Sequence, residues 1–236
     1  MSDSASNPPP DVSAIPDSTI RIYAVVFSVG VVCSLAIVTA HEITRPIITG
    51  NKVAFRQRSI PRVLPNTVAI ETYRFDETTG QFRTASSDAS GSDLVFAGFD
   101  RQRKLVGLAI EAQGMGYQDT IGLLYGYLFD QQAIVGVQVL ESRETPGLGD
   151  RIETDVNFAR NFDRLDVALS PDGRQPAHPI EFVKPGKKTA QWQIDGISGA
   201  TISSRAIAEI LRDSTAYWVP RVYPRQSDFL QSDGGK

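Results

Sequence analysis

The feature that most constrains this chain is an uncharged apolar stretch near its N-terminus. Residues 22–40 are 19 consecutive positions without a charge, rich in Val, Ile, Leu and Ala. A helix of this length measures roughly 28 Å, close to the thickness of a bilayer's hydrocarbon core. A cleaved signal peptide and a buried core helix are the alternatives. A signal peptide carries a basic leading region and a shorter apolar run, whereas the preceding residues here are acidic. We therefore predict a retained transmembrane helix over residues 20–40.

The segments that flank this helix differ in charge. Residues 1–19 hold four prolines, several serines and three aspartates, a composition that predicts a flexible tail. Residues 41–65 predict a juxtamembrane helical connector that ends at Pro65. Its basic residues either contact lipid headgroups or form a solvated face, and they are Arg45, Lys52, Arg56, Arg58 and Arg62.

Composition excludes several classes of function for the rest of the chain. The 236 residues carry a net charge of −3, and the main body is acidic, which disfavours nucleic-acid binding. A single cysteine, Cys33, excludes an intrachain disulfide, and two scattered histidines make a histidine-based metal site improbable, so no metal site is expected. Any redox chemistry therefore requires an organic cofactor.

Beyond Pro65 the pattern changes to short runs rich in branched and aromatic residues, separated by Gly, Asp and Ser. These runs predict strands at residues 68–75, 94–99, 105–112, 120–129 and 134–140. Residues 84–92 predict a polar loop, residues 170–188 are polar and proline-bearing, and the spacing of Phe158 and Phe162 predicts a short helix. The predicted domain spans residues 66–220, followed by a flexible tail at 221–236.

The candidate site begins with the heptapeptide Asp195-Gly196-Ile197-Ser198-Gly199-Ala200-Thr201. Apolar residues recur at helical spacing directly after it, so it predicts a tight turn that leads into an amphipathic helix. The first turn of a helix offers unpaired backbone N–H groups and the positive end of the helix dipole, which together favour a phosphate. Thr201 would present its hydroxyl at that position. An ordinary helix start with Ser198 or Thr201 as N-cap is the alternative.

Nucleophilic hydrolysis is a second alternative, because residues 196–200 are close to the G-x-S-x-G elbow. That elbow requires a histidine later in the chain. His41 and His178 both precede Ser198, so a hydrolase is disfavoured. No acid and base pair stands out beside the turn, and we expect no catalytic residue and no independent turnover of a small substrate.

Two glycine-bearing loops are further candidates. Gly114-Met115-Gly116-Tyr117 interrupts the strand pattern, and closely spaced glycines allow a ligand or another strand to approach the backbone. A plain bulge or turn explains it equally well. Glu144-Thr145-Pro146-Gly147-Leu148-Gly149-Asp150 follows the last predicted strand and is too rich in Pro and Gly for regular structure.

Together these motifs resemble those of a known family. The motif Asp195-x-x-Ser198-Gly199-Ala200-Thr201 is similar to the flavinylation motif of FMN-binding domains. With the single N-terminal helix, the glycine loop before a strand and the Glu144–Asp150 loop, the chain resembles the G subunit of the Rnf electron-transport complex from residue 20 to 218. The related C subunit of the sodium-pumping NADH:quinone oxidoreductase is the close alternative. That protein usually has a tryptophan near the first glycine loop, where this chain has Tyr117-Gln118-Asp119.

The resemblance implies an α+β fold, in which one transmembrane helix precedes an FMN-binding domain with an antiparallel-rich sheet and flanking helices. It implies FMN joined covalently to Thr201 through a phosphoester, with Ser198, Gly199 and Ala200 shaping the phosphate turn. Residues of the second loop would wall the isoalloxazine ring, and these are Glu144, Thr145, Pro146, Gly147, Leu148 and Gly149. Tyr117 would lie at the same site, and Asp195 would orient the threonine or a metal used by the transferase.

The resemblance further implies an electron-carrying subunit that couples electron transfer between NADH and ferredoxin to ion translocation. Its partners would be the other membrane subunits of the complex, the lipid bilayer and, during maturation, a flavin transferase. A membrane-anchored assembly protein without flavin remains the alternative from another class of function.

Two arguments predict opposite sides of the membrane for the domain. Only Arg21 precedes the apolar stretch and five basic residues follow it, so the positive-inside rule favours a cytoplasmic domain. Long domains are translocated largely regardless of charge, however. The resemblance implies a single-pass protein of the bacterial inner membrane, with the tail in the cytoplasm and the flavin domain on the periplasmic side.

Overall fold

The computed structural model describes residues 17–230, and the chain divides into two units, residues 1–51 and residues 52–236. Helix α1 (Asp17–Val63) begins within the range predicted as a flexible tail; residues 1–16 of that tail lie outside the described residues. The segment Thr19–Val63 contains a window of mean hydropathy 2.4, whose residues are all exposed. It is therefore long and apolar enough to cross a membrane.

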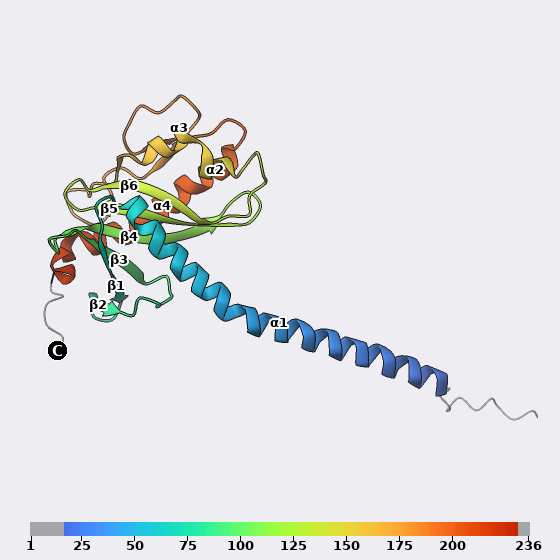
Figure 1. Ribbon diagram of the computed structural model, residues 1–236. Coiled ribbons are helices and arrows are strands. Elements are labelled where there is room, and N and C mark those ends of the chain that lie inside the picture. The colour runs from blue at the N-terminus through green and yellow to red at the C-terminus, as the bar shows by residue number, and fades with distance from the viewer. Residues whose placement is uncertain (1–16, 231–236) are drawn as a thin grey trace, which may run out of the picture. The chain divides into compact units, whose positions relative to one another are not determined.

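The second unit is built on an antiparallel sheet of seven strands (Figure 1), whose order is β2-β1-β3-β4-β5-β6-β7. The strands are β1 (Ala69–Asp76), β2 (Gln81–Ala85), β3 (Leu94–Phe99), β4 (Leu105–Met115), β5 (Thr120–Leu128), β6 (Ala133–Glu141) and β7 (Leu165–Asp166). A separate parallel pair joins β8 (Glu181–Val183) to β9 (Gln193–Asp195). The helices are α2 (Arg151–Thr154), α3 (Val156–Ala159) and α4 (Thr201–Val222), with 3-10 helices η1 (Arg160–Phe162) and η2 (Tyr223–Phe229).

The five predicted strands correspond to β1, β3, β4, β5 and β6, and the predicted short helix corresponds to α3 with η1. The prediction missed β2, which overlaps the loop expected at 84–92, and it also missed β7, β8 and β9. Strands β7, β8 and β9 have two or three residues each. Runs this short have no periodicity of their own, so their partners decide their conformation. The α+β fold class is confirmed.

One face of the sheet is covered by α4. Its apolar side chains pack into the main core together with residues of β4 and β5 and with the aromatic rings of Phe82 and Phe229. A Cβ atom at Gly114 on β4 would lie 2.5 Å from Cγ1 of Ile210, so the glycine lets the helix lie directly on the strand. Ile202, in the first turn of α4, departs from this pattern because it is 56% exposed.

The other face of the sheet is covered by the last turns of α1. Ile60, Val63 and Leu64 pack against Leu94, Phe96, Ala109 and Leu124 in a second apolar cluster. A Cβ atom at Gly126 would lie 2.0 Å from the carbonyl oxygen of Val63, and one at Gly136 would lie 2.8 Å from its Cα. These two glycines let the backbone of α1 approach β5 and β6 closely.

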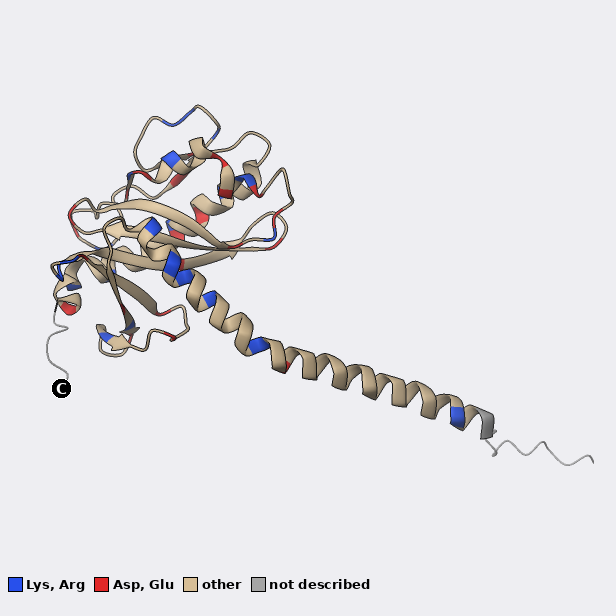
Figure 2. Cartoon of the chain, viewed as in Figure 1, with Lys and Arg blue, Asp and Glu red and all other residues tan. Residues whose placement is uncertain are grey.

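Figure 2 shows most of the basic residues of α1 gathered in its C-terminal half. Arg56 is not the lipid-facing or solvated residue that the sequence predicts, because it is buried over Phe96, with 4.5 Å from the guanidinium carbon to the ring centroid. It donates hydrogen bonds to the carbonyl groups of Ser87 and Ala89. Its guanidinium also lies 3.6 Å from Glu111, a carboxyl group whose pKa is raised by burial.

The C-terminal segment is also more ordered than predicted. The range expected to be a flexible tail begins at residue 221, but α4 continues to Val222 and η2 follows it. Phe229 is fully buried and contacts Phe82 and Tyr73, with ring centroids 4.8 and 5.1 Å apart. Residues 231–236 lie outside the described residues. The aromatic anchor at Phe229 explains why the tail prediction was wrong here.

Candidate functional site

The turn at residues 196–201, called the phosphate turn after its predicted role, leads directly into α4. Gly199 has a φ of +87°, a conformation that a side chain disfavours, and it turns the chain sharply before the helix. The buried hydroxyl of Ser204 accepts a hydrogen bond from the N–H of Ile197 and donates to the carbonyl of Ala200 at 2.8 Å. The first turn of α4 therefore fixes the geometry of the loop that precedes it.

This helix start lacks an ordinary cap. The N-cap residue is Ala200, and no side chain among residues 17–230 forms a capping hydrogen bond there. The alternative in which Ser198 or Thr201 serves as N-cap is therefore wrong. Most helices place a Ser, Thr, Asp or Asn at this position to satisfy the free N–H groups. In α4 the backbone N–H groups of the first turn therefore remain available to another acceptor. The exposed Thr201 lies beside them.

Glu144 connects the second loop to the phosphate turn. Its side chain is buried, with the residue 6% exposed. Oε1 accepts a hydrogen bond of 3.0 Å from the backbone N–H of Gln118, and Oε2 accepts one from the hydroxyl of Ser203 on α4. A Cβ atom at Gly116 or Gly149 would lie 2.4 Å from a Glu144 carboxylate oxygen. Glu144 thus joins the turn after β4, the loop after β6 and the first turn of α4.

Of the other predicted residues of the second loop, Gly149 is buried, Thr145 is partly exposed and the rest lie on the surface. Pro146, Gly147 and Leu148 are exposed, and Gly147 has a φ of +77°. Thr145 donates a hydrogen bond of 2.7 Å to the side chain of Gln118. The other apolar side chains exposed on the connected segments are Met115, Tyr117 and Ile202. Buried Glu144 and exposed apolar neighbours suit a surface that receives a flat apolar ring.

Asp195 is placed differently from the others. Its carboxylate accepts hydrogen bonds of 2.9 Å from the N–H of Gly186 and 3.2 Å from that of Lys187, in the turn after β8. Its backbone N–H and carbonyl both bond the side chain of Asn161. In this arrangement Asp195 orders the segment before the phosphate turn. Its carboxylate binds the turn after β8 and not the phosphate turn.

Sequence reasoning missed three residues that the structure brings to the site. Ser203 and Gln118 hold Glu144, as described above. Arg151, the first residue of α2, donates a hydrogen bond of 2.6 Å from Nη1 to the carbonyl of Ser198. Arg151 directly follows the Glu144–Asp150 loop, and that adjacency was the available signal. No spacing in the sequence pointed to Ser203.

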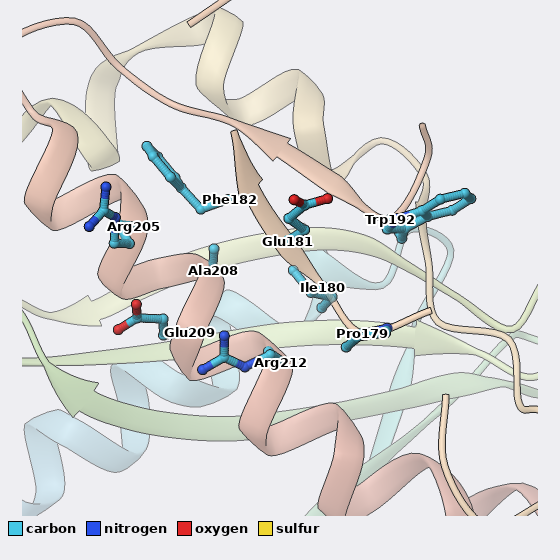
Figure 3. Close-up of a pocket in the computed structure, with 9 residues that line it drawn as sticks. All are labelled: Pro179, Ile180, Glu181, Phe182, Trp192, Arg205, Ala208, Glu209 and Arg212. Atoms are coloured by element: carbon cyan, nitrogen blue, oxygen red, sulfur yellow. The ribbon is translucent and has the colours of Figure 1, made fainter. Parts of the chain in front are cut away.

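A pocket of about 590 Å³ lies elsewhere, between α4 and the β8 segment (Figure 3). Arg205, Glu209 and Arg212 of α4 line one side of it, and Glu181 and Phe182 of β8 lie across from them. The Arg205 guanidinium lies 5.1 Å from the centroid of the Phe182 ring. None of the predicted site residues lines this pocket.

Comparison with known proteins bears on the same segments. The model of the FMN-binding domain matches residues 116–216, a range that contains Gly116 and Tyr117 of the first loop, the whole second loop and the phosphate turn. The G subunit of the ion-translocating oxidoreductase complex of Methanosarcina acetivorans is 34% identical over 143 residues, which are 61% of this chain and 66% of the relative. That of Cereibacter sphaeroides is 30% identical over 183 residues, 75% of this chain and 73% of the relative.

Solved structures share the fold. NqrC of Shewanella oneidensis superposes with a TM-score of 0.52 at 22% identity, over 74% of this chain and 86% of that one. The C subunit of the Na⁺-translocating NADH-quinone reductase of Parabacteroides distasonis gives 0.51 at 23% identity, over 71% and 80%. The sequence relatives described above are G subunits, and the fold is shared with C subunits. The chain therefore belongs to the family of G subunits of ion-translocating oxidoreductase complexes, and it carries an FMN-binding domain.

Proposed function

We propose that this protein is an electron-carrying subunit of an Rnf-type complex and that its FMN is attached through a phosphoester to Thr201. The observation that carries the proposal is the uncapped start of α4, where an exposed threonine stands beside free backbone N–H groups after a glycine of positive φ. Such a helix start is a favourable phosphate site. The family assignment makes the phosphate of FMN its natural occupant.

Different residues of the site hold the phosphate and the ring of the cofactor. FMN accepts two electrons and passes them on singly, and this chemistry belongs to the cofactor. Thr201 anchors the phosphate end, and Gly199 and Ala200 keep side chains out of its path. Leu148 and Tyr117 offer apolar surface to the ring, and Glu144 fixes the two loops that carry them. Attachment through the phosphate prevents loss of the cofactor and leaves the ring electronics almost unchanged.

We further propose that the complex couples electron transfer between NADH and ferredoxin to ion movement, with the other membrane subunits as partners. The names of the relatives support a role in an ion-translocating oxidoreductase complex. The G-subunit relatives favour this reading over the C subunit of a sodium-pumping quinone reductase. An assembly protein without flavin is the remaining alternative, and the match to the FMN-binding domain speaks against it.

The flavin domain is proposed to lie on the periplasmic side of a bacterial inner membrane, anchored by the apolar part of α1. The charge count that opposes this location is weaker than it looks in the sequence. Arg56 is buried on the sheet and Lys52 pairs with Glu141 at 2.7 Å, so both basic residues take part in the fold of the domain. Covalent attachment also suits a compartment in which a lost FMN could not be replaced.

The proposal is tested by producing the full chain together with its flavin transferase. The denatured protein should fluoresce as flavin on a gel, and Thr201→Ala should be dark. Ser227→Ala is the control, because Ser227 is an exposed hydroxyl residue of η2 outside the turn, and it should stay bright. A bright Thr201→Ala band would refute the attachment site, and a colourless wild-type protein would favour the assembly role.

A further inference from the structure

Arg151 is held in one orientation beside the phosphate turn. Nη1 donates a hydrogen bond of 2.6 Å to the carbonyl of Ser198, and Nη2 donates one of 3.0 Å to Oδ2 of Asp155. A carboxylate on one side and a carbonyl on the other therefore hold the planar guanidinium. An arginine held at two points loses less freedom when it binds a further group.

Asp155 is itself held in place. Its Oδ1 accepts hydrogen bonds from the backbone N–H groups of Asn157 and Phe158, and so caps α3. The Phe158 bond is the main cause of a lowered pKa of the Asp155 carboxyl group, and the Arg151 guanidinium adds to it. The carboxylate that orients Arg151 is thus ionised and fixed by its own helix.

The guanidinium retains capacity for another acceptor. Arginine has five N–H donors, and within residues 17–230 its hydrogen bonds use one at Nη1 and one at Nη2. The side chain is 41% exposed. A Cβ atom at Gly199 would lie 3.7 Å from Nη1, so the guanidinium lies against the turn two residues before Thr201. The turn itself, residues 196–201, contains no charged side chain.

We propose that Arg151 is a phosphate-binding residue of the flavin site, which supplies the positive charge that the phosphate turn lacks. The inference rests on the proposed attachment of FMN to Thr201. A phosphodiester carries a negative charge, and arginine binds phosphate oxygens through charge-assisted hydrogen bonds that are about twice as strong as neutral ones. The helix start and Arg151 then hold the phosphate from two sides while the threonine is esterified and afterwards.

The test is the rate at which purified flavin transferase, with FAD as the donor, loads full-length protein in detergent. In-gel flavin fluorescence per protein measures the rate. Arg151→Gln should load about tenfold to a hundredfold more slowly, the usual worth of a hydrogen bond to a charged group. Arg151→Lys, which keeps the charge, should stay within about threefold of wild type. The difference between wild type and Arg151→Gln should shrink as salt is added, because salt screens charges.

Arg74→Gln is the matched control. Arg74 is 49% exposed and pairs with Asp93 at 3.0 Å, the same distance as between Arg151 and Asp155, but it lies on β1 away from the turn. It should load like wild type. If Arg151→Gln also loads like wild type, the proposal is wrong. If Arg151→Lys and Arg151→Gln slow loading equally and salt does not change the loss, Arg151 only supports the carbonyl of Ser198. That result would also overturn the proposal.

Asp155→Asn tests the proposal without altering Arg151, in case Arg151→Gln does not fold. Asparagine keeps one oxygen for the α3 cap, but it presents an NH2 group to Nη2 and removes the charge that offsets the guanidinium. Arg151 keeps its own charge and its bond to the carbonyl of Ser198, so loading should stay within about tenfold of wild type and should depend more steeply on salt. A larger loss in folded Asp155→Asn, or an unchanged salt dependence, would contradict the proposal. Failure of the wild-type protein to load would instead count against the attachment at Thr201.

Discussion

At the scale of single residues, Glu144 is the side chain on which the site depends. The sequence predicted it as part of a wall around the flavin ring, from its place in the loop motif. The structure places it in the interior, between Gly116 and Gly149, where it accepts hydrogen bonds from Gln118 and Ser203. These partners lie far apart in the chain, so no local pattern could have predicted the contact. The glycines could be seen in the sequence, but the close contact with the Glu144 carboxylate that requires them could not.

Replacing Glu144 with alanine should destabilise the domain and disorder both loops. The hydroxyl of Ser203 and the N–H of Gln118 would lose their acceptor, and each buried unsatisfied group costs about 1–3 kcal/mol. The two groups together cost about 2–6 kcal/mol, which in a domain of this size corresponds to a fall of roughly 4–24 °C in Tm. Glu141→Ala is the control, since Glu141 lies on the surface with Lys52 and such pairs contribute about 0–1 kcal/mol. Equal Tm values for the two variants would contradict this account of Glu144.

At the scale of elements, the strongest periodic signals gave correct elements and the exceptions marked the site. The long alternating runs became β1 and β3 to β6, and the apolar positions 206, 207, 210 and 211 of α4 became core. Ile202 belongs to the same periodic pattern but is exposed, next to Thr201. The absence of a cap at Ala200 was also hidden, because two hydroxyl residues flank the helix start and either could have served. Backbone geometry places Ala200 at the N-cap, so neither of them caps the helix.

The close contact between α1 and the sheet makes a prediction about two glycines of β5. Gly126→Ala would place a Cβ atom 2.0 Å from the carbonyl oxygen of Val63, whereas Gly122→Ala meets nothing closer than 3.6 Å, at Cβ of Glu141. Overpacking of this kind typically costs about 1–3 kcal/mol. Thermal unfolding of the full chain in detergent should therefore show a clear loss of Tm for Gly126→Ala and little change for Gly122→Ala. Similar values for both would mean that α1 does not pack against β5 as described.

At the scale of the whole molecule, the charge count and the family resemblance predict opposite sides of the membrane for the domain. Composition alone pointed to the cytoplasm, because five basic residues follow the apolar stretch. Sequence reasoning could not tell that Arg56 and Lys52 are engaged by the domain, since Phe96, Glu111 and Glu141 reach them only through the fold. The family resemblance was found from motifs, because a motif can be recognised in the sequence even where the spatial contacts of its residues cannot.

Protease added to spheroplasts should digest the flavin domain while a cytoplasmic marker protein stays intact. The expected result follows from the proposed periplasmic location, because the domain is then the exposed part of the protein. Lysed spheroplasts supply the control, in which both proteins become accessible. Protection of the domain until lysis would place it in the cytoplasm and would mean that the charge count was right.

The central claim is that Thr201 carries FMN, and mass spectrometry of one peptide tests it most directly. Trypsin cleaves after Lys188 and Arg205, and releases residues 189–205 with the whole phosphate turn. Protein made with the transferase should yield this peptide with the added mass of FMN joined by loss of water, and fragmentation should place the adduct on Thr201. An adduct on Ser198, Ser203 or Ser204, or an unmodified peptide from protein that still binds flavin, would contradict the claim.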